Sequence, residues 1–161
     1  MKSIKENVQT WIDDQGFRGV HVVEHEPTET MFAWTYSSRV ATYEAFVDAD
    51  EQDGVLAITI YLPLMVPAAH EAAVNMMIMR RNYHQRFGAV EYGGRDGRLR
   101  YRTTTLLGSD RNTTETVDFL FSWANRMADE AMMQLGALLF RDAPSIEAPR
   151  LEALGAPATV H

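Results

Sequence analysis

The sequence predicts an α+β fold in which helices pack on an antiparallel β-sheet of about five strands. Strand-like and helix-like segments occur in runs, in the order α-β-β-β-α-β-β-α, whereas parallel α/β proteins alternate them singly. Residues 31–62 alternate apolar and polar side chains with period two, which is typical of half-buried strands. Two capping boxes and one proline precede apolar stretches of helical period and mark the starts of three helices.

The N-terminal segment is predicted to form a helix over residues 3–15. Ser3 and Glu6 form a capping box, in which the serine oxygen accepts an early backbone N–H and the glutamate accepts the N–H of the serine. Apolar residues then recur at helical spacing, and Gly16 supplies a left-handed end. Residues 19–25 are a candidate for a short additional strand, which the polar, proline-containing stretch after them would end.

Three antiparallel strands are predicted at residues 31–36, 40–47 and 55–62. The turn at 48–54 is acidic and ends in Asp-Gly, a common loop signature. Its carboxylates lack the bidentate glutamate that a calcium-binding loop places after them. We therefore interpret these carboxylates as part of a solvated turn.

The second helix is predicted over residues 67–85. Pro67 suits a first helical turn because the N–H that it lacks would have no helical partner, and Gly88 ends the helix. Strands at 89–92 and 99–106 then form a hairpin around a glycine-rich turn. The helix side chains expected to face the core are Ala69, Ala72, Ala73, Met76, Met79 and Tyr83.

The third helix is predicted over residues 113–140, opened by a capping box from Asn112 to Glu115. Further apolar residues lie beside its core stripe, so the apolar arc exceeds the roughly 100° that packing on one sheet needs. Either the N-terminal helix and the sheet wrap this helix completely, or part of it forms an interface. The expected core stripe consists of Val117, Leu120, Ala124, Met127, Ala131, Leu135 and Leu138.

The length of 161 residues predicts one domain, which we place at residues 1–141. Residues 142–161 are rich in alanine and proline and contain few apolar side chains that could be buried. Prolines at three positions prevent a long helix there. We therefore expect a flexible Ala/Pro-rich tail.

Charge and composition predict a soluble cytoplasmic protein. The net charge of −7 disfavours nucleic acid and anionic membranes, and the basic residues near 80–102 also suit a solvated strand face. The absence of cysteine favours a reducing compartment. The charged N-terminus has no apolar core of a signal peptide, and no segment approaches the ~20 apolar residues that span a bilayer.

The sequence contains no motif that predicts catalysis, a metal or a cofactor. The strand-like spacing of His21 and His25 separates them by ~13 Å, and that of His70 and His84 along one helix by ~21 Å. The serines lack the strand-turn-helix setting of a nucleophile elbow. We therefore expect no enzyme, with no catalytic residue, no cofactor and no metal ligand.

Apolar side chains outside the core stripes are the candidates for binding a partner. Methionine is flexible and polarizable, so Met-rich surfaces can repack around different partners. We expect these side chains to contact a protein partner or client, or a second copy of the chain in a homodimer. The candidates are Phe119, Phe121 and Trp123 on the third helix and Val74, Met77 and Ile78 on the second.

Over residues 3–140 the chain resembles the YbjN-domain proteins, a bacterial family that shares the fold of type III secretion chaperones. The resemblance rests on Val66-Pro67 at the helix start, Asn82 six residues before Gly88, and Asp96-Gly97 before the strand LRYRTTTL. The third helix with its terminal aromatic residues completes it. The chain differs from the family in its longer polar segment at 19–30 and in its tail.

The resemblance implies a chaperone-like α+β module that acts as a sensory transduction regulator. Secretion chaperones of this fold typically dimerise and bind an extended segment of a client, and the family implies no catalytic residue. A second interpretation is a small-molecule-binding or enzymatic domain with a pocket between helix 67–85 and the sheet. A concave polar pocket with converging titratable groups would favour an enzyme, whereas a broad apolar face would favour a binding module.

Overall fold

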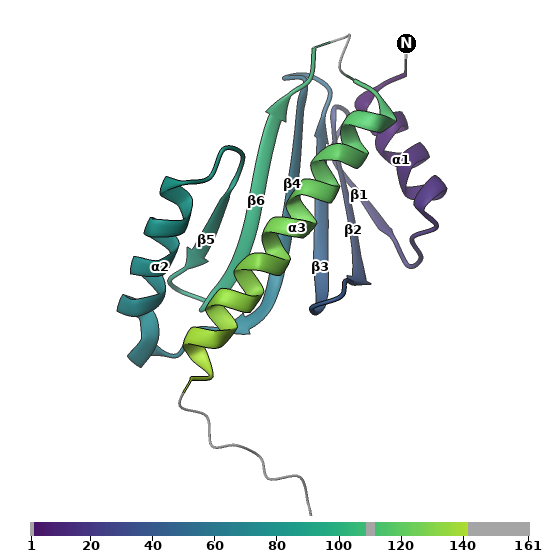
Figure 1. Ribbon diagram of the computed structural model, residues 1–161. Helices are drawn as coiled ribbons and strands as arrows, with labels where there is room; N and C mark the ends of the chain where they lie inside the picture. The colour runs from purple at the N-terminus through teal and green to yellow at the C-terminus, as the bar shows by residue number, and fades with distance from the viewer. Residues whose placement is uncertain (1, 109–111, 142–161) are drawn as a thin grey trace, which may run out of the picture.

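The computed structural model describes residues 2–108 and 112–141, with the side chain of residue 25 left out. Helices and strands follow the order α-β-β-β-β-α-β-β-α, which confirms the α+β class (Figure 1). The candidate strand after the first helix is present and brings the sheet to six strands. The elements are α1 (Ile4–Gln15), β1 (His21–Glu26), β2 (Glu29–Ser37), β3 (Thr42–Asp50), β4 (Val55–Met65), η1 (Ala68–His70), α2 (Glu71–Tyr83), β5 (Ala89–Gly93), β6 (Arg98–Leu106) and α3 (Thr114–Leu139).

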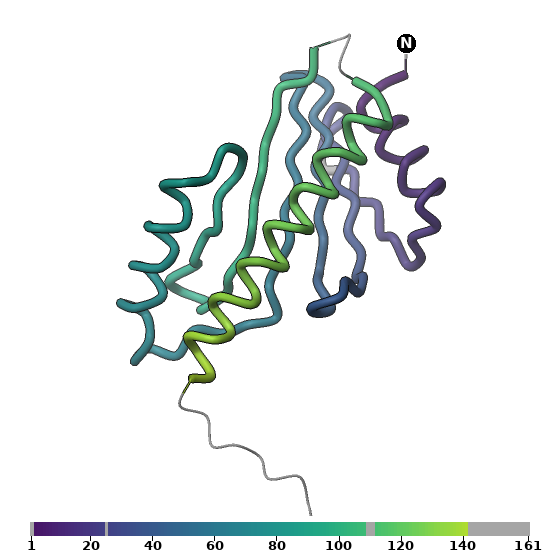
Figure 2. Tube along the Cα trace, viewed as in Figure 1, coloured from purple at the N-terminus to yellow at the C-terminus, as the bar shows by residue number. Residues whose placement is uncertain are grey.

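The strands form one antiparallel sheet in the order β1-β2-β3-β4-β6-β5. Helices α1 and α3 cover one face, and α3 runs diagonally across the strands (Figure 1). The chain leaves β4, forms α2 beside the edge of the sheet and returns as β5 and β6 (Figure 2). This connection places α2 next to the edge strand β5 and away from the centre of the sheet.

The core lies between the sheet and its two covering helices. Alternate residues of β3 are buried in it, which confirms the period-two pattern there, whereas the five residues from Leu56 to Ile60 of β4 are buried on both faces of the sheet. Phe121 of α3 joins an aromatic cluster in which neighbouring ring centroids lie 4.9–6.2 Å apart. The cluster uses part of the wide apolar arc of α3 for internal packing. Its members are Trp11, Phe17, Trp34, Tyr36 and Phe121.

The helix ends agree with the sequence at α1 and differ at α3. Ser3 and Glu6 form the predicted capping box, and Gly16 ends α1 in the left-handed conformation with φ 70°. The N-cap of α3 is Thr113, whose side chain accepts from the backbone N–H of Thr116, so the predicted capping box at Asn112 is wrong. The side chain of Asn112 instead accepts from Asn7 of α1 and donates to the carbonyl of Lys2, just before that helix.

The predicted core face of α2 is also wrong. Val74 and Ile78, one turn apart, are the buried residues of this helix, while Met76, Met79 and Tyr83 are exposed. The reason is the position of α2 at the edge of the sheet. Only a narrow face of the helix contacts β5, so the broad stripe of alanine and methionine residues remains outside the core.

The predicted tail at residues 142–161 lies outside the described residues, and the boundary at residue 141 therefore stays a prediction. Helix α3 ends at Leu139, close to the predicted end. Within residues 2–108 and 112–141, no helix is both long and apolar enough to cross a membrane.

Candidate functional site: a groove between α2 and α3

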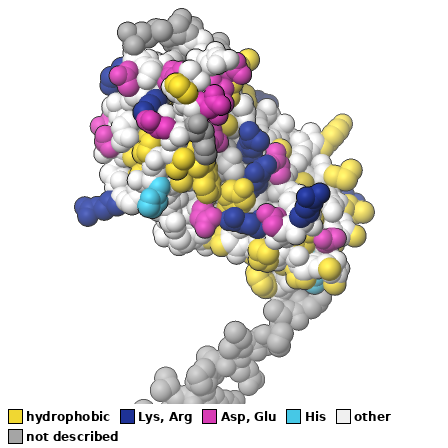
Figure 3. Space-filling view, turned by 180° about the vertical axis from the view of Figure 1, so that it is seen from behind, with side chains coloured by type: hydrophobic (Ala, Val, Ile, Leu, Met, Phe, Trp, Pro, Cys, Tyr) yellow, Lys and Arg dark blue, Asp and Glu magenta, His cyan; other side chains and the backbone are white. Residues whose placement is uncertain are grey.

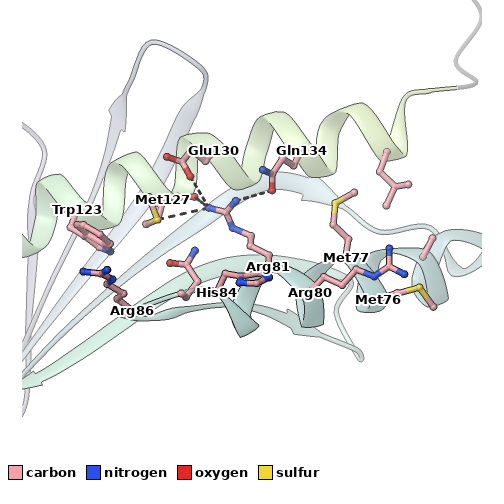
Figure 4. Close-up of a pocket in the computed structure, with 13 residues that line it drawn as sticks. Met76, Met77, Arg80, Arg81, His84, Arg86, Trp123, Met127, Glu130 and Gln134 are labelled. Atoms are coloured by element: carbon pink, nitrogen blue, oxygen red, sulfur yellow. Dashed lines mark hydrogen bonds and ion pairs between the residues drawn. The ribbon is translucent and has the colours of Figure 1, made fainter.

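A groove with a volume of about 810 Å³ separates α2 from the part of α3 between Trp123 and Leu138 (Figure 4). Its walls come from these two helices and from the turn that follows α2. Apolar and cationic side chains share its surface. The lining residues are Ala73, Met76, Met77, Arg80, Arg81, His84, Gln85, Arg86, Trp123, Met127, Glu130, Gln134 and Leu138.

The groove exists because α2 is fastened to the edge of the sheet. Val74 and Ile78 are buried on the inner side of α2, which packs on β5. The Asn82 side chain then pairs with the backbone of Val90 as a neighbouring strand would. Its Nδ2 donates to the Val90 carbonyl at 2.8 Å, and its Oδ1 accepts from the Val90 N–H at 2.9 Å. These contacts hold α2 against β5, so the side of α2 that faces α3 remains open.

Arg81 is the main polar link across the groove. Its Nη1 donates to Gln134 Oε1 at 2.7 Å, and its Nη2 donates to the carbonyl of Met127 at 3.1 Å. The side chain is only 9% exposed, although its ion pair with Glu130 is long, at 3.4 Å. Because Glu130 is 44% exposed, solvent screens this ion pair, which should add little to the stability that the two shorter hydrogen bonds provide. The Nε atom of Arg81 has no hydrogen-bond partner among the described residues.

The apolar part of the groove is rich in methionine. Met76 on α2 is 55% exposed and Met77 is half-buried. Met127 on α3 is buried. Trp123 closes one end, where its ring lies 5.7 Å from that of Phe87. Such side chains can change conformation to fit the shape of a bound molecule.

The groove is positively charged on a protein that is acidic as a whole. Three arginines and one glutamate line it, which gives a formal charge of +2 with histidine neutral. The whole chain has a net charge of −7. The groove therefore concentrates positive potential where anionic groups of a ligand would be attracted.

The six predicted partner-binding residues fall into three groups. Trp123 and Met77 line the groove. Phe119 is exposed on α3 outside the groove, with its ring 6.5 Å from that of Trp123. The other three, Val74, Ile78 and Phe121, are buried in the core of the chain. They have little surface to offer a partner, because the sheet edge and the aromatic cluster already cover them.

Sequence reasoning did not identify the cationic side of this groove. Arg80 and His84 follow Met76 at intervals of four residues, which places the three on one face of α2. That spacing was the available signal for a mixed apolar and basic face. Grouped by their position along the chain, the basic residues near 80–102 indicated one solvated strand face instead.

Arginines on β6 have partners within the sheet. Arg98 donates to Glu44 at 2.7 Å and lies 4.0 Å from the ring centre of Tyr61, and Arg100 donates to Glu91 at 2.6 Å. They lie on the face of the sheet that no described helix covers. Figure 3 views the molecule from behind and shows hydrophobic side chains near the middle of that side with charged side chains around them.

The second interpretation expected a pocket between α2 and the sheet, but among the described residues the groove lies between α2 and α3 instead. Val74 and Ile78 are buried between α2 and the sheet. Within the described part of the chain, no group of three or more His, Asp or Glu side chains could hold a metal ion. The groove lining contains no serine, threonine, tyrosine or lysine.

Comparison with known proteins agrees with the fold and supplies a family. No curated protein matches the chain. Among solved structures, "Crystal structure of YbjN, a putative transcription regulator from E. coli" matches with a TM-score of 0.56 and 10% sequence identity, over 83% of this chain and 91% of that chain. At this identity the likeness shows the fold alone.

The sequence pattern of one family matches residues 5–136, which include all six strands and α2 and all but the first residue of α1 and the last three residues of α3. The match agrees with the resemblance carried by the helix start at Val66-Pro67, by Asn82 and by the hairpin glycine. On this evidence the chain belongs to the YbjN family, whose description is "Putative bacterial sensory transduction regulator".

Proposed function

We propose that this protein is a non-enzymatic, cytoplasmic protein-binding module of the chaperone-like or regulatory kind, and that the groove between α2 and α3 is its partner site. The family description names a regulator and not an enzyme. A regulator without its own chemistry acts by binding, and so it needs a surface that another molecule can cover.

The exposed methionine surface of the groove is the observation that carries this proposal. Met76 is exposed while Met77 and Met127 line the same depression, so the groove presents apolar area to water. An apolar depression rimmed by polar groups is a common feature of protein interaction sites. Catalysis has less support, because the only acidic side chain in the lining, Glu130, is paired with Arg81.

Affinity purification from the bacterial host tests this proposal with two matched variants. Met76→Glu places a charge in the groove, and Met79→Glu places the same charge on an exposed position of α2 outside the groove lining. Both side chains are exposed, so each substitution should change the free energy of unfolding by less than about 0.5 kcal/mol. Circular dichroism checks that both variants remain folded.

We expect Met76→Glu to lose a protein that the unaltered chain and Met79→Glu both retain. A carboxylate in the groove must be desolvated when a partner covers it, which weakens binding. Equal retention by all three chains would contradict the groove as the partner site. Equal loss by both variants would place the partner on the outer face of α2.

A further inference from the structure

We propose that the partner segment bound in the groove is an acidic amphipathic α-helix. This inference rests on the proposed function, because it names the chemistry of the partner that the same groove would bind. It follows from the distribution of charge along the groove and from the elements that form its walls.

The cationic side chains are spread along the groove. Arg86 lies at the end closed by Trp123, Arg80 lies at the opposite end beside Met76, and Arg81 lies between them and reaches toward α3 (Figure 4). A ligand with a single anionic head could neutralise only one end of this series. Several carboxylates, spaced along one molecule, could contact all of it.

The walls favour a helix over an extended segment. The lining residues belong to α2, to α3 and to the turn after α2, and none belongs to a strand. An extended peptide would find no sheet edge to pair with here, and its backbone groups would face methionine side chains without hydrogen bonds. A helix satisfies its own backbone and can lay apolar side chains into a groove at positions i, i+3, i+4 and i+7.

The apolar base supplies the matching contacts. Met76 and Met77 on one wall and Met127 and Leu138 on the other present flexible or branched apolar side chains toward the groove. Leucines of a partner helix would fit between these walls, while acidic residues beside them would meet the arginines of α2. The resulting complex combines apolar burial with charge complementarity, which speeds association and selects against basic partners.

Synthetic peptides provide the test. The probe is a labelled helical peptide of about 14 residues with leucine at i, i+3, i+4 and i+7 and glutamate beside them. Two further peptides carry lysine in place of glutamate, or the acidic composition in scrambled order. Fluorescence anisotropy measures affinity for the full chain, and NMR of methionine methyl groups reports whether Met76, Met77 and Met127 are contacted.

A double charge reversal separates the groove from general electrostatics. In the test variant, Arg80→Glu is combined with Arg86→Glu, and Arg81 is retained because its hydrogen bonds support the groove. The control combines Arg39→Glu with Arg95→Glu, two exposed positions outside the groove, and has the same net charge. We expect the test variant to bind the acidic peptide at least about tenfold more weakly and the control to bind within about threefold of the unaltered chain.

The acidic helical peptide should bind more tightly than the other two, shift the three methionine methyl signals, and weaken with added salt. Equal or tighter binding of the lysine peptide would overturn the acidic partner while leaving a protein-binding groove intact. Equal binding of the scrambled peptide would overturn the helical form. Failure of the proposed function itself would appear separately, as equal retention of the host partner by Met76→Glu and Met79→Glu.

Discussion

Asn82 should contribute about 1–3 kcal/mol to the stability of the fold, because its side chain makes two hydrogen bonds to the backbone of Val90. Asn82→Ala removes both bonds and leaves the Val90 N–H and carbonyl without these partners. Asn82→Asp keeps an acceptor for the N–H but turns a carboxylate oxygen toward the carbonyl. At neutral pH we expect it to destabilise at least as much as the alanine variant.

Urea denaturation followed by circular dichroism measures this effect. The midpoint should fall while the slope with denaturant stays unchanged, because the same surface is exposed on unfolding. For a protein of this size, a loss of about 2 kcal/mol corresponds to a decrease in melting temperature of roughly 4–8 °C.

Asn75→Ala is the matched control. Asn75 is exposed on the same helix, and its side chain has no hydrogen bond to another described residue. Alanine favours helix more than asparagine does, so this variant should be neutral or more stable by up to ~0.5 kcal/mol. If Asn82→Ala lowers stability by no more than Asn75→Ala does, the attachment of α2 to β5 does not depend on this side chain, and our explanation of the groove is wrong.

Three further predictions concern other parts of the molecule. In thermal melts, Gly88→Ala should lower the stability of the fold by about 2 kcal/mol or more beyond the effect of Gly19→Ala. Both glycines have φ 67°, but of the two only Gly88 has atoms close to where a Cβ would lie, including a carbonyl oxygen at 2.6 Å. An equal effect at the two sites would refute the clash. Burial raises the pKa of Tyr36 and Tyr43 well above the ordinary 10.0. Their contribution to stability should therefore be complete below about pH 10 and be lost as the pH rises, because the tyrosines of the unfolded chain release their protons at lower pH. Phenolate absorbance should accordingly appear at lower pH in denaturant than in the folded protein. Coincident titrations of the folded and unfolded protein would contradict this. We also propose that the protein is a homodimer through α3: Phe119→Glu should give a folded monomer in light scattering, and a monomeric unaltered chain at tens of micromolar would refute the dimer.

The elements that the sequence predicted well carry strong local signals. The capping box at Ser3 and the alternation of β3 depend on neighbouring residues and require no knowledge of the rest of the molecule. The buried face of α2 could not be predicted in this way. Val74 and Ile78 are buried because α2 meets the sheet at its edge, and that position follows from the tertiary arrangement.

The groove depends on distant parts of the chain for the same reason. Arg81 binds the carbonyl of Met127, 46 residues later, and no local pattern indicates that these two residues meet. Trp123 and Met77 were selected because they lie outside the expected core stripes, and both line the groove. Phe121 was selected on the same reasoning, but it is buried because α1 and β2 contribute aromatic side chains that surround it.

Photo-crosslinking in the bacterial host tests most directly whether the groove binds a protein partner. A photoreactive amino acid replaces Met76 in the groove in one chain and Thr104, exposed on the uncovered face of the sheet, in another. The proposal predicts an adduct with a different protein from position 76 and none from position 104. An adduct from position 104 alone, or from position 76 only with a second copy of the chain, would contradict it.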